Sequence, residues 1–239
     1  MSVDPEVAPK PRGTGRPFRL FGRISLTVLA GMAIVVLYAT GQIAPASSDR
    51  AAQERLQLAT QAGGSLTLVL LAIQVSLGFI LSHPTGTSTW SLSKRLFRLH
   101  THLWVFVIAF LVVHIASVVL DPFAKVSILG ALIPGLSAYR IWPVALGTMA
   151  LYAFLVTALT AGYTNLLPAG VWLTIHRVSL VVFVLAWLHV QLIGTESDDL
   201  GRVYAGTGVV VVASGLYRLW ASGRRRPTFL ARLREASDD

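Results

Sequence analysis

Four histidines lie in two apolar stretches in which Arg177 is the one charged residue: His100 and His114 in the first, His176 and His189 in the second. Ionisable side chains inside a membrane are costly, and they usually mark functional sites. Imidazole is a common ligand of transition metals, including haem iron. The chain contains no cysteine, which excludes disulfides, thiolate metal sites and iron–sulfur clusters and leaves imidazole as the obvious metal ligand.

The spacing of these histidines predicts two levels. Fourteen residues separate His100 from His114, a rise of about 21 Å with the two side chains about 40° apart around a helix, so they share a face. Thirteen residues separate His176 from His189, a rise of about 20 Å, but this step turns the second side chain about 140° away from the first. The matched rises predict that His100 pairs with His176 and His114 with His189. Two such pairs can hold two six-coordinate haem b groups, which carry electrons and leave the iron no open site.

Two alternatives compete with this interpretation. His102 lies twelve residues before His114 and about 120° from it around the helix, so it fits the shared face less well than its rival His100. The histidines could also form hydrogen bonds between helices, as polar residues in membranes do. The chain would then be a non-redox transporter or metal-binding protein that purifies without colour.

Membrane-spanning helices must position these residues. The chain of 239 residues is 54% hydrophobic and 13% charged, with a mean hydropathy of +0.66, whereas soluble domains carry about 25% charged residues. A span needs about 20 apolar residues, and Gly63-Gly64 and Pro134-Gly135 are expected in connections between spans. We predict an all-α, six-transmembrane helix bundle over residues 22–220, preceded by a basic disordered arm (1–21) and followed by a basic tail (221–239). The expected spans are residues 22–40, 64–82, 98–120, 142–163, 172–193 and 203–220.

The basic residues predict the orientation of this bundle. With both termini cytoplasmic, fifteen of the 20 Lys and Arg residues lie on the inner side and five on the outer side, as the positive-inside rule requires. Topology therefore accounts for the net charge of +9, and the expected partner is membrane lipid rather than nucleic acid. We expect a multi-pass protein of the plasma membrane, specifically a bacterial inner membrane.

The histidine segments resemble the ferric reductase-like transmembrane family, which includes the membrane halves of NADPH oxidases, the iron-reducing oxidoreductases and the bacterial haem subunit of the methionine sulfoxide reductase system. The resemblance covers about residues 64–220. It implies two haem b groups, with His100 and His176 at the inner haem and His114 and His189 at the outer one. One departure is His100-Thr101, where the family usually has His-Arg. The matching segments are Leu99-His100-Thr101-His102-Leu103, Val113-His114-Ile115, Trp172-Leu173-Thr174-Ile175-His176-Arg177, Trp187-Leu188-His189-Val190 and Ile193-Gly194-Thr195-Glu196-Ser197-Asp198.

Several further residues are expected to support the cofactors. Arg98 and Arg177, next to the inner histidines, are candidates for contacts with anionic haem propionates, and Arg140 and Arg202 are weaker candidates on the outer side. Phe183 lies seven residues after His176, on nearly the same face, where it would pack between the haem levels. Trp172 is expected in the interfacial aromatic belt.

The electron donor is expected to be a separate molecule. Family enzymes add a flavin and nicotinamide module after the sixth span, whereas no Gly-rich dinucleotide loop is found in this sequence. We therefore expect a separate flavoprotein reductase, or quinol, to supply electrons. The expected outer-face acceptor is a ferric chelate, oxygen or a partner protein, and a cytochrome subunit that passes electrons from quinol to a partner enzyme is a related alternative.

Overall fold

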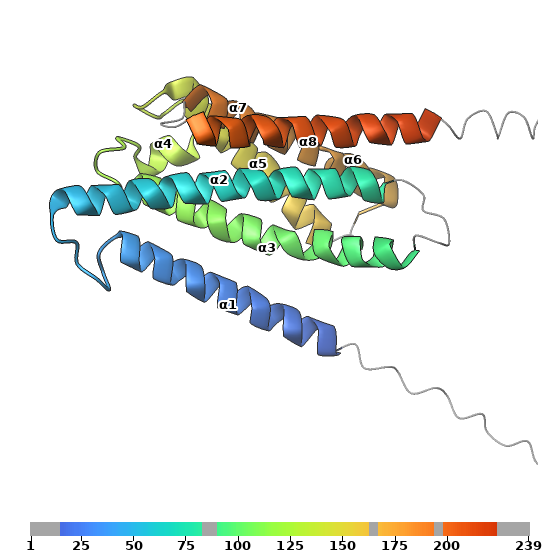
Figure 1. Ribbon diagram of the computed structural model, residues 1–239, viewed down its shortest axis with the longest axis horizontal. Coiled ribbons are helices and arrows are strands. Elements are labelled where there is room, and N and C mark those ends of the chain that lie inside the picture. The colour runs from blue at the N-terminus through green and yellow to red at the C-terminus, as the bar shows by residue number, and fades with distance from the viewer. Residues whose placement is uncertain (1–14, 83–89, 163–166, 194–197, 224–239) are drawn as a thin grey trace, which may run out of the picture.

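The computed structural model describes residues 15–82, 90–162, 167–193 and 198–223, and the regular elements in these ranges are helices (Figure 1). The long helices lie side by side, and the short helix α4 covers one end of the bundle. In chain order the helices are α1 (Gly15–Ala39), α2 (Asp49–Leu81), α3 (Trp90–Leu120), α4 (Ile128–Leu132), α5 (Ile141–Gly162), α6 (Ala169–Arg177), α7 (Ser179–Ile193) and α8 (Asp198–Gly223).

Five helical segments in the described ranges are long and apolar enough to cross a membrane, and they correspond to the last five predicted spans. The all-α, multi-pass character of the chain is therefore supported. The first predicted span corresponds to α1, whose described apolar part, Leu26–Ala39, is shorter than a bilayer requires. The count of six spans and the side of each terminus remain predictions. The five segments are Asp49–Leu81, Ser91–Leu120, Ile141–Ala161, Gly170–Ile193 and Asp199–Ser222.

The two ends of the bundle differ in charge. Every acidic residue of the described ranges lies at the end that α4 covers, which we call the outer end, following the charge pattern of the sequence. Arg98, Arg177 and Arg218 lie toward the opposite, inner end. Residues 1–14 of the predicted arm and 224–239 of the predicted tail lie outside the described residues, while 15–21 begin α1 and 221–223 end α8.

Helix α2 is longer than predicted and runs through Gly63 and Gly64. It begins after Ser48, whose Oγ accepts a hydrogen bond from the backbone N–H of Ala51 at 3.2 Å and caps the helix. The expectation that Gly63-Gly64 marks a connection is wrong. A Cβ on Gly63 would lie 2.9 Å from the backbone nitrogen of His114, so the missing side chain allows α2 and α3 to touch.

The fifth predicted span consists of two helices, α6 and α7, which meet at Val178. The backbone N–H of Val178 donates to the carbonyl oxygen of Ile175 at 2.9 Å, an i→i−3 bond of the 3₁₀ type. A residue in a 3₁₀ turn advances about 120° around the axis rather than about 100°. The tight turn therefore rotates His189 toward the face of His176 and reduces the mismatch that a regular helix would leave.

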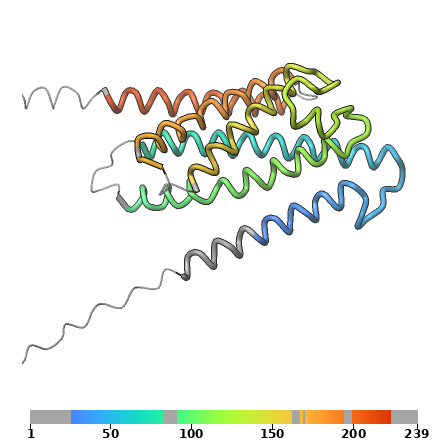
Figure 2. Tube along the Cα trace, turned by 180° about the vertical axis from the view of Figure 1, so that it is seen from behind, coloured from blue at the N-terminus to red at the C-terminus, as the bar shows by residue number. Residues whose placement is uncertain are grey.

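An apolar core occupies the bundle between the two histidine levels. Residues of α2, α3, α5, α7 and α8 contribute to this core. Helix α2 packs along α3 and α8, and α7 packs against α5. The hydroxyls of Tyr204 in α8 and Ser65 in α2 share a hydrogen bond of 2.7 Å. Helix α1 lies at the edge of the bundle beside α3 (Figure 2). The buried core residues are Leu68, Leu71, Ala72, Val75, Val107, Phe154, Val182, Phe183, Tyr204 and Val211.

Candidate functional site

The fold brings the four predicted histidines together in two pairs. The ring centroids of His100 and His176 are 5.9 Å apart with an interplanar angle of 78°, and those of His114 and His189 are 6.3 Å apart at 83°. When two imidazoles bind one metal from opposite sides, with metal–nitrogen bonds of about 2.0 Å and ring centres about 1.1 Å behind each nitrogen, the ring centres lie about 6.2 Å apart. Both pairs match this spacing.

Each histidine of the outer pair has one ring nitrogen hydrogen-bonded to a backbone carbonyl. His114 Nδ1 lies 2.9 Å from the oxygen of Thr60 in α2, and His189 Nδ1 lies 2.7 Å from the oxygen of Pro143 in α5. A carbonyl oxygen can only accept a hydrogen bond, so Nδ1 carries the proton in both rings. This tautomer leaves Nε2 with a free lone pair, the arrangement typical of metal-binding histidines.

The inner pair is held by different contacts. Trp172 stacks on the ring of His176, with centroids 5.3 Å apart and an interplanar angle of 12°. Gln74 in α2 donates from Nε2 to the carbonyl oxygen of His100 at 2.9 Å. Four side-chain atoms at this level are buried without a hydrogen-bond partner: Nδ1 of His100, Nδ1 of His176, Nε1 of Trp172 and Oε1 of Gln74. Because buried polar atoms normally have hydrogen-bond partners, the surroundings of the inner histidine pair can accommodate further polar groups that bond to these four atoms.

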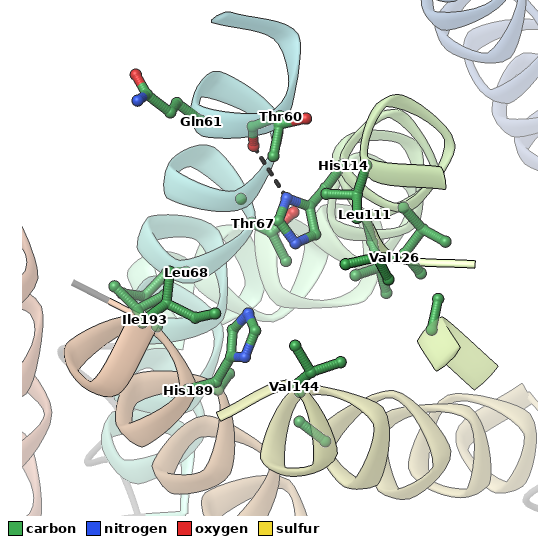
Figure 3. A pocket seen from close by; sticks show the side chains of 18 of the residues that line it. Thr60, Gln61, Thr67, Leu68, Leu111, His114, Val126, Val144, His189 and Ile193 are labelled. Atoms are coloured by element: carbon green, nitrogen blue, oxygen red, sulfur yellow. Dashed lines mark hydrogen bonds between the residues drawn. The ribbon is translucent and has the colours of Figure 1, made fainter. Parts of the chain in front are cut away.

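A cavity of about 660 Å³ runs past the outer pair (Figure 3). Figure 3 shows His114 and His189 pointing toward each other across it. The volume lies within the range of about 300–1,000 Å³ that is usual for cofactor and ligand sites. Apolar side chains line the cavity toward the middle of the bundle, and polar ones line it toward the outer end. The apolar group includes Leu68, Leu71, Val107, Phe154 and Val182, and the polar group includes Gln53, Gln57, Gln61, Asp121, Tyr139 and Arg140.

His102 does not take part in either pair. Its side chain is exposed, and its Nδ1 lies 2.6 Å from the carbonyl oxygen of Arg98 on its own helix. His100, two residues earlier, instead faces His176 across the bundle. Of the two rivals for the inner level, the fold therefore presents His100.

The supporting residues predicted from the sequence lie in different surroundings. Arg98 and Arg177 are exposed at the inner end of the bundle, while Phe183 is only 4% exposed and belongs to the core between the histidine levels. Arg140 lines the outer cavity and donates to the carbonyl oxygen of Leu192 at 3.0 Å. Arg202 forms an ion pair with Asp199. Residues 194–197, part of the segment similar to the bacterial Gly-Thr-Asp ending, lie outside the described residues.

Three contacts at the site were not predicted. The roles of the carbonyl groups of Thr60 and Pro143 cannot be predicted from residue types, because every residue has a backbone carbonyl group. Trp172 stacks on His176, a contact that the expectation of an interfacial belt position did not include. Its position did carry a signal, since it precedes His176 by four residues and the two side chains of a helix then share a face.

Comparisons with protein-family models, curated proteins and solved structures find no match to this chain. In the part of the chain that the structure describes, no three or more His, Cys, Asp or Glu side chains form a metal-binding group. Fold and site together describe a helical, multi-pass membrane protein with two facing histidine pairs at two depths.

Proposed function

We propose that the chain is a di-haem b membrane cytochrome that conducts electrons from the inner to the outer side of a bacterial inner membrane, like the ferric reductase-like proteins it resembles. His100 and His176 would hold the inner haem, and His114 and His189 the outer one. The observation that carries this proposal is the spacing of the two ring pairs, 5.9 and 6.3 Å, which suits one metal between each pair.

The residues around the outer pair fit a haem group. Haem combines an iron that needs axial nitrogen ligands, an apolar macrocycle and anionic propionates. The outer pair offers two imidazoles whose Nδ1 atoms already donate to carbonyl groups. The cavity beside them is apolar toward the bundle core and contains Arg140 at its polar end. At the inner end, Arg98 and Arg177 are the proposed propionate partners.

The haem, held by these histidines, would supply a one-electron couple. The protein has three tasks in this proposal. The histidines hold two redox groups at fixed depths, about 21 Å apart along α3. The core that contains Val107 and Phe183 separates the two levels and excludes water. The basic inner end faces the donor, which we propose to be a cytoplasmic flavoprotein or quinol, and the outer cavity faces the acceptor.

The test is an absorption spectrum of the detergent-purified protein with pyridine haemochrome quantitation. We expect about two haem b groups per chain, reducible by dithionite. One haem per chain would require a new ligand assignment. A colourless protein, purified from cells supplied with ample haem, would refute the proposal and favour the alternative of a non-redox transporter or metal-binding protein. If the protein binds haem, its reduction in proteoliposomes by quinol, or by NADH with a flavin reductase, would distinguish the two proposed donors.

A further inference from the structure

A glycine lies against the ring of each outer histidine. Gly64 follows Thr60 by four residues in α2, and Gly147 follows Pro143 by four residues in α5. A Cβ on Gly64 would lie 2.9 Å from Nδ1 of His114, and a Cβ on Gly147 would lie 2.8 Å from Nδ1 of His189. These distances are shorter than real Cβ contacts, so a larger residue at either position would force the ring or the helix to shift.

The same arrangement therefore occurs on two different helices. Residues i and i+4 of a helix share a face. The carbonyl group of Thr60 and the missing side chain of Gly64 therefore lie next to each other on α2, and those of Pro143 and Gly147 lie next to each other on α5. We call each of these a carbonyl–glycine cradle. In both, the glycine lets the imidazole lie against the helix backbone, where its Nδ1 reaches the carbonyl four residues earlier.

The inner level differs in this respect. Helix α2 runs antiparallel to α3, and Gly64 and Gly78 are fourteen residues apart, as are His100 and His114. Helix α2 therefore places Gly64 beside His114 and Gly78 beside His100. However, a Cβ on Gly78 would lie 3.8 Å from Cε1 of His100, an ordinary contact. Nδ1 of His100 and Nδ1 of His176 have no hydrogen-bond partner. The tight cradle is thus a feature of the outer pair.

We infer that Gly64 and Gly147 are positioning residues for the outer haem ligands. Each allows an imidazole to donate from Nδ1 to a carbonyl, which fixes the tautomer and turns Nε2 toward the metal. Such a hydrogen bond also makes the imidazole a more basic ligand, which stabilises ferric over ferrous iron. Each of these hydrogen bonds therefore lowers the midpoint potential of the outer haem below the value that it would have without the bond. This inference rests on the proposed function for the haem, although the ring orientation is a property of the chain itself.

The test compares glycine-to-alanine variants in a redox titration followed by absorbance. Gly64→Ala and Gly147→Ala are each expected to remove the outer haem, leaving one haem per chain, or to raise the outer midpoint potential while the inner one is unchanged. Gly206→Ala is the matched control, because a Cβ there meets nothing within 4 Å. Gly63→Ala probes the packing of α2 on α3, because its Cβ would meet the backbone of Phe110 and His114 rather than the imidazole ring. It is expected to lower the melting temperature.

Two results must be distinguished. If the wild-type protein binds no haem, the proposed function fails. If the wild type binds two haems, and Gly64→Ala and Gly147→Ala keep both at wild-type potentials, the inference about the glycines is overturned while the function stands. If Gly64→Ala and Gly147→Ala keep the outer haem but lower its midpoint potential, the link between the cradle and the potential is overturned.

A second measurement needs neither haem nor a variant. Nitrogen-15 NMR of histidine-labelled wild-type protein, purified without haem, reports which ring nitrogen carries the proton. At least three histidines are expected in the Nδ1–H tautomer: His114 and His189, as the bonds to Thr60 and Pro143 require, and His102, whose Nδ1 lies 2.6 Å from the carbonyl oxygen of Arg98. If no more than one neutral histidine is in the Nδ1–H form, the cradles do not hold the outer rings.

Discussion

Replacement of His114 by alanine is expected to remove the outer haem and leave the inner one in place. The ring of His114 supplies one of two facing imidazoles, 6.3 Å from its partner His189, and alanine has no atom that can reach a metal between them. The nearest other histidine on α3, His102, is about 18 Å away along the helix. No side chain on α3 can therefore replace the lost ligand.

The expected magnitude follows from the separation of the two levels. Haem content should fall from two to one per chain, and the reduced-minus-oxidised α-band should fall to about half. The inner pair lies about 21 Å away along α3, and effects of substitutions more than about 7–10 Å apart are usually independent. The midpoint potential of the inner haem should therefore stay at its wild-type value.

The assay is a potentiometric titration of purified protein, combined with haem quantitation and circular dichroism to verify helix content. His102→Ala is the matched control, because that side chain is exposed and bonds to its own helix. It should keep both haems. If His114→Ala retained two haems at wild-type potentials, or if His102→Ala lost the inner haem, the ligand assignment would be wrong.

Three further predictions concern the geometry and packing of the site. The nearly perpendicular imidazole planes, 78° and 83°, should give strongly anisotropic low-spin ferric EPR signals for both haems, whereas rhombic spectra of parallel ligands would contradict these angles. Tyr204→Phe removes the 2.7 Å hydrogen bond to Ser65 and should lower the free energy of unfolding in detergent by about 0.6 kcal/mol, the average for such bonds in membranes; unchanged stability would mean that the bond does not tie α8 to α2. Arg140→Gln removes a cation from the outer cavity and should lower the midpoint potential of the outer haem, because positive charge stabilises the reduced state. Arg202→Gln is the control and should leave this potential unchanged, because Arg202 pairs with Asp199. Equal effects of the two variants would contradict the assignment of Arg140 to the haem propionates.

The sequence by itself determined the helical elements and the depths of the histidines. Both depend on local properties, namely the length of apolar stretches and the constant rise of a helix. The spacings of fourteen and thirteen residues were enough to predict which histidines share a level. The length of α2 was not predicted, because whether a helix continues through glycine depends on the helices that pack against it. The break at Val178 was not predicted either, because a local 3₁₀ turn depends on packing in the same way.

Only the tertiary structure decided how the rings are held. The hydrogen-bond partners of His114 and His189 are backbone carbonyls 54 and 46 residues away in the chain, and a carbonyl has no side-chain signature. The roles of Gly64 and Gly147 appear only when α2 and α5 lie so close to the imidazole rings that an added Cβ would come within 3 Å of them. Contacts of this kind depend on which helix faces meet, and that is set by packing across the whole bundle rather than by any local pattern.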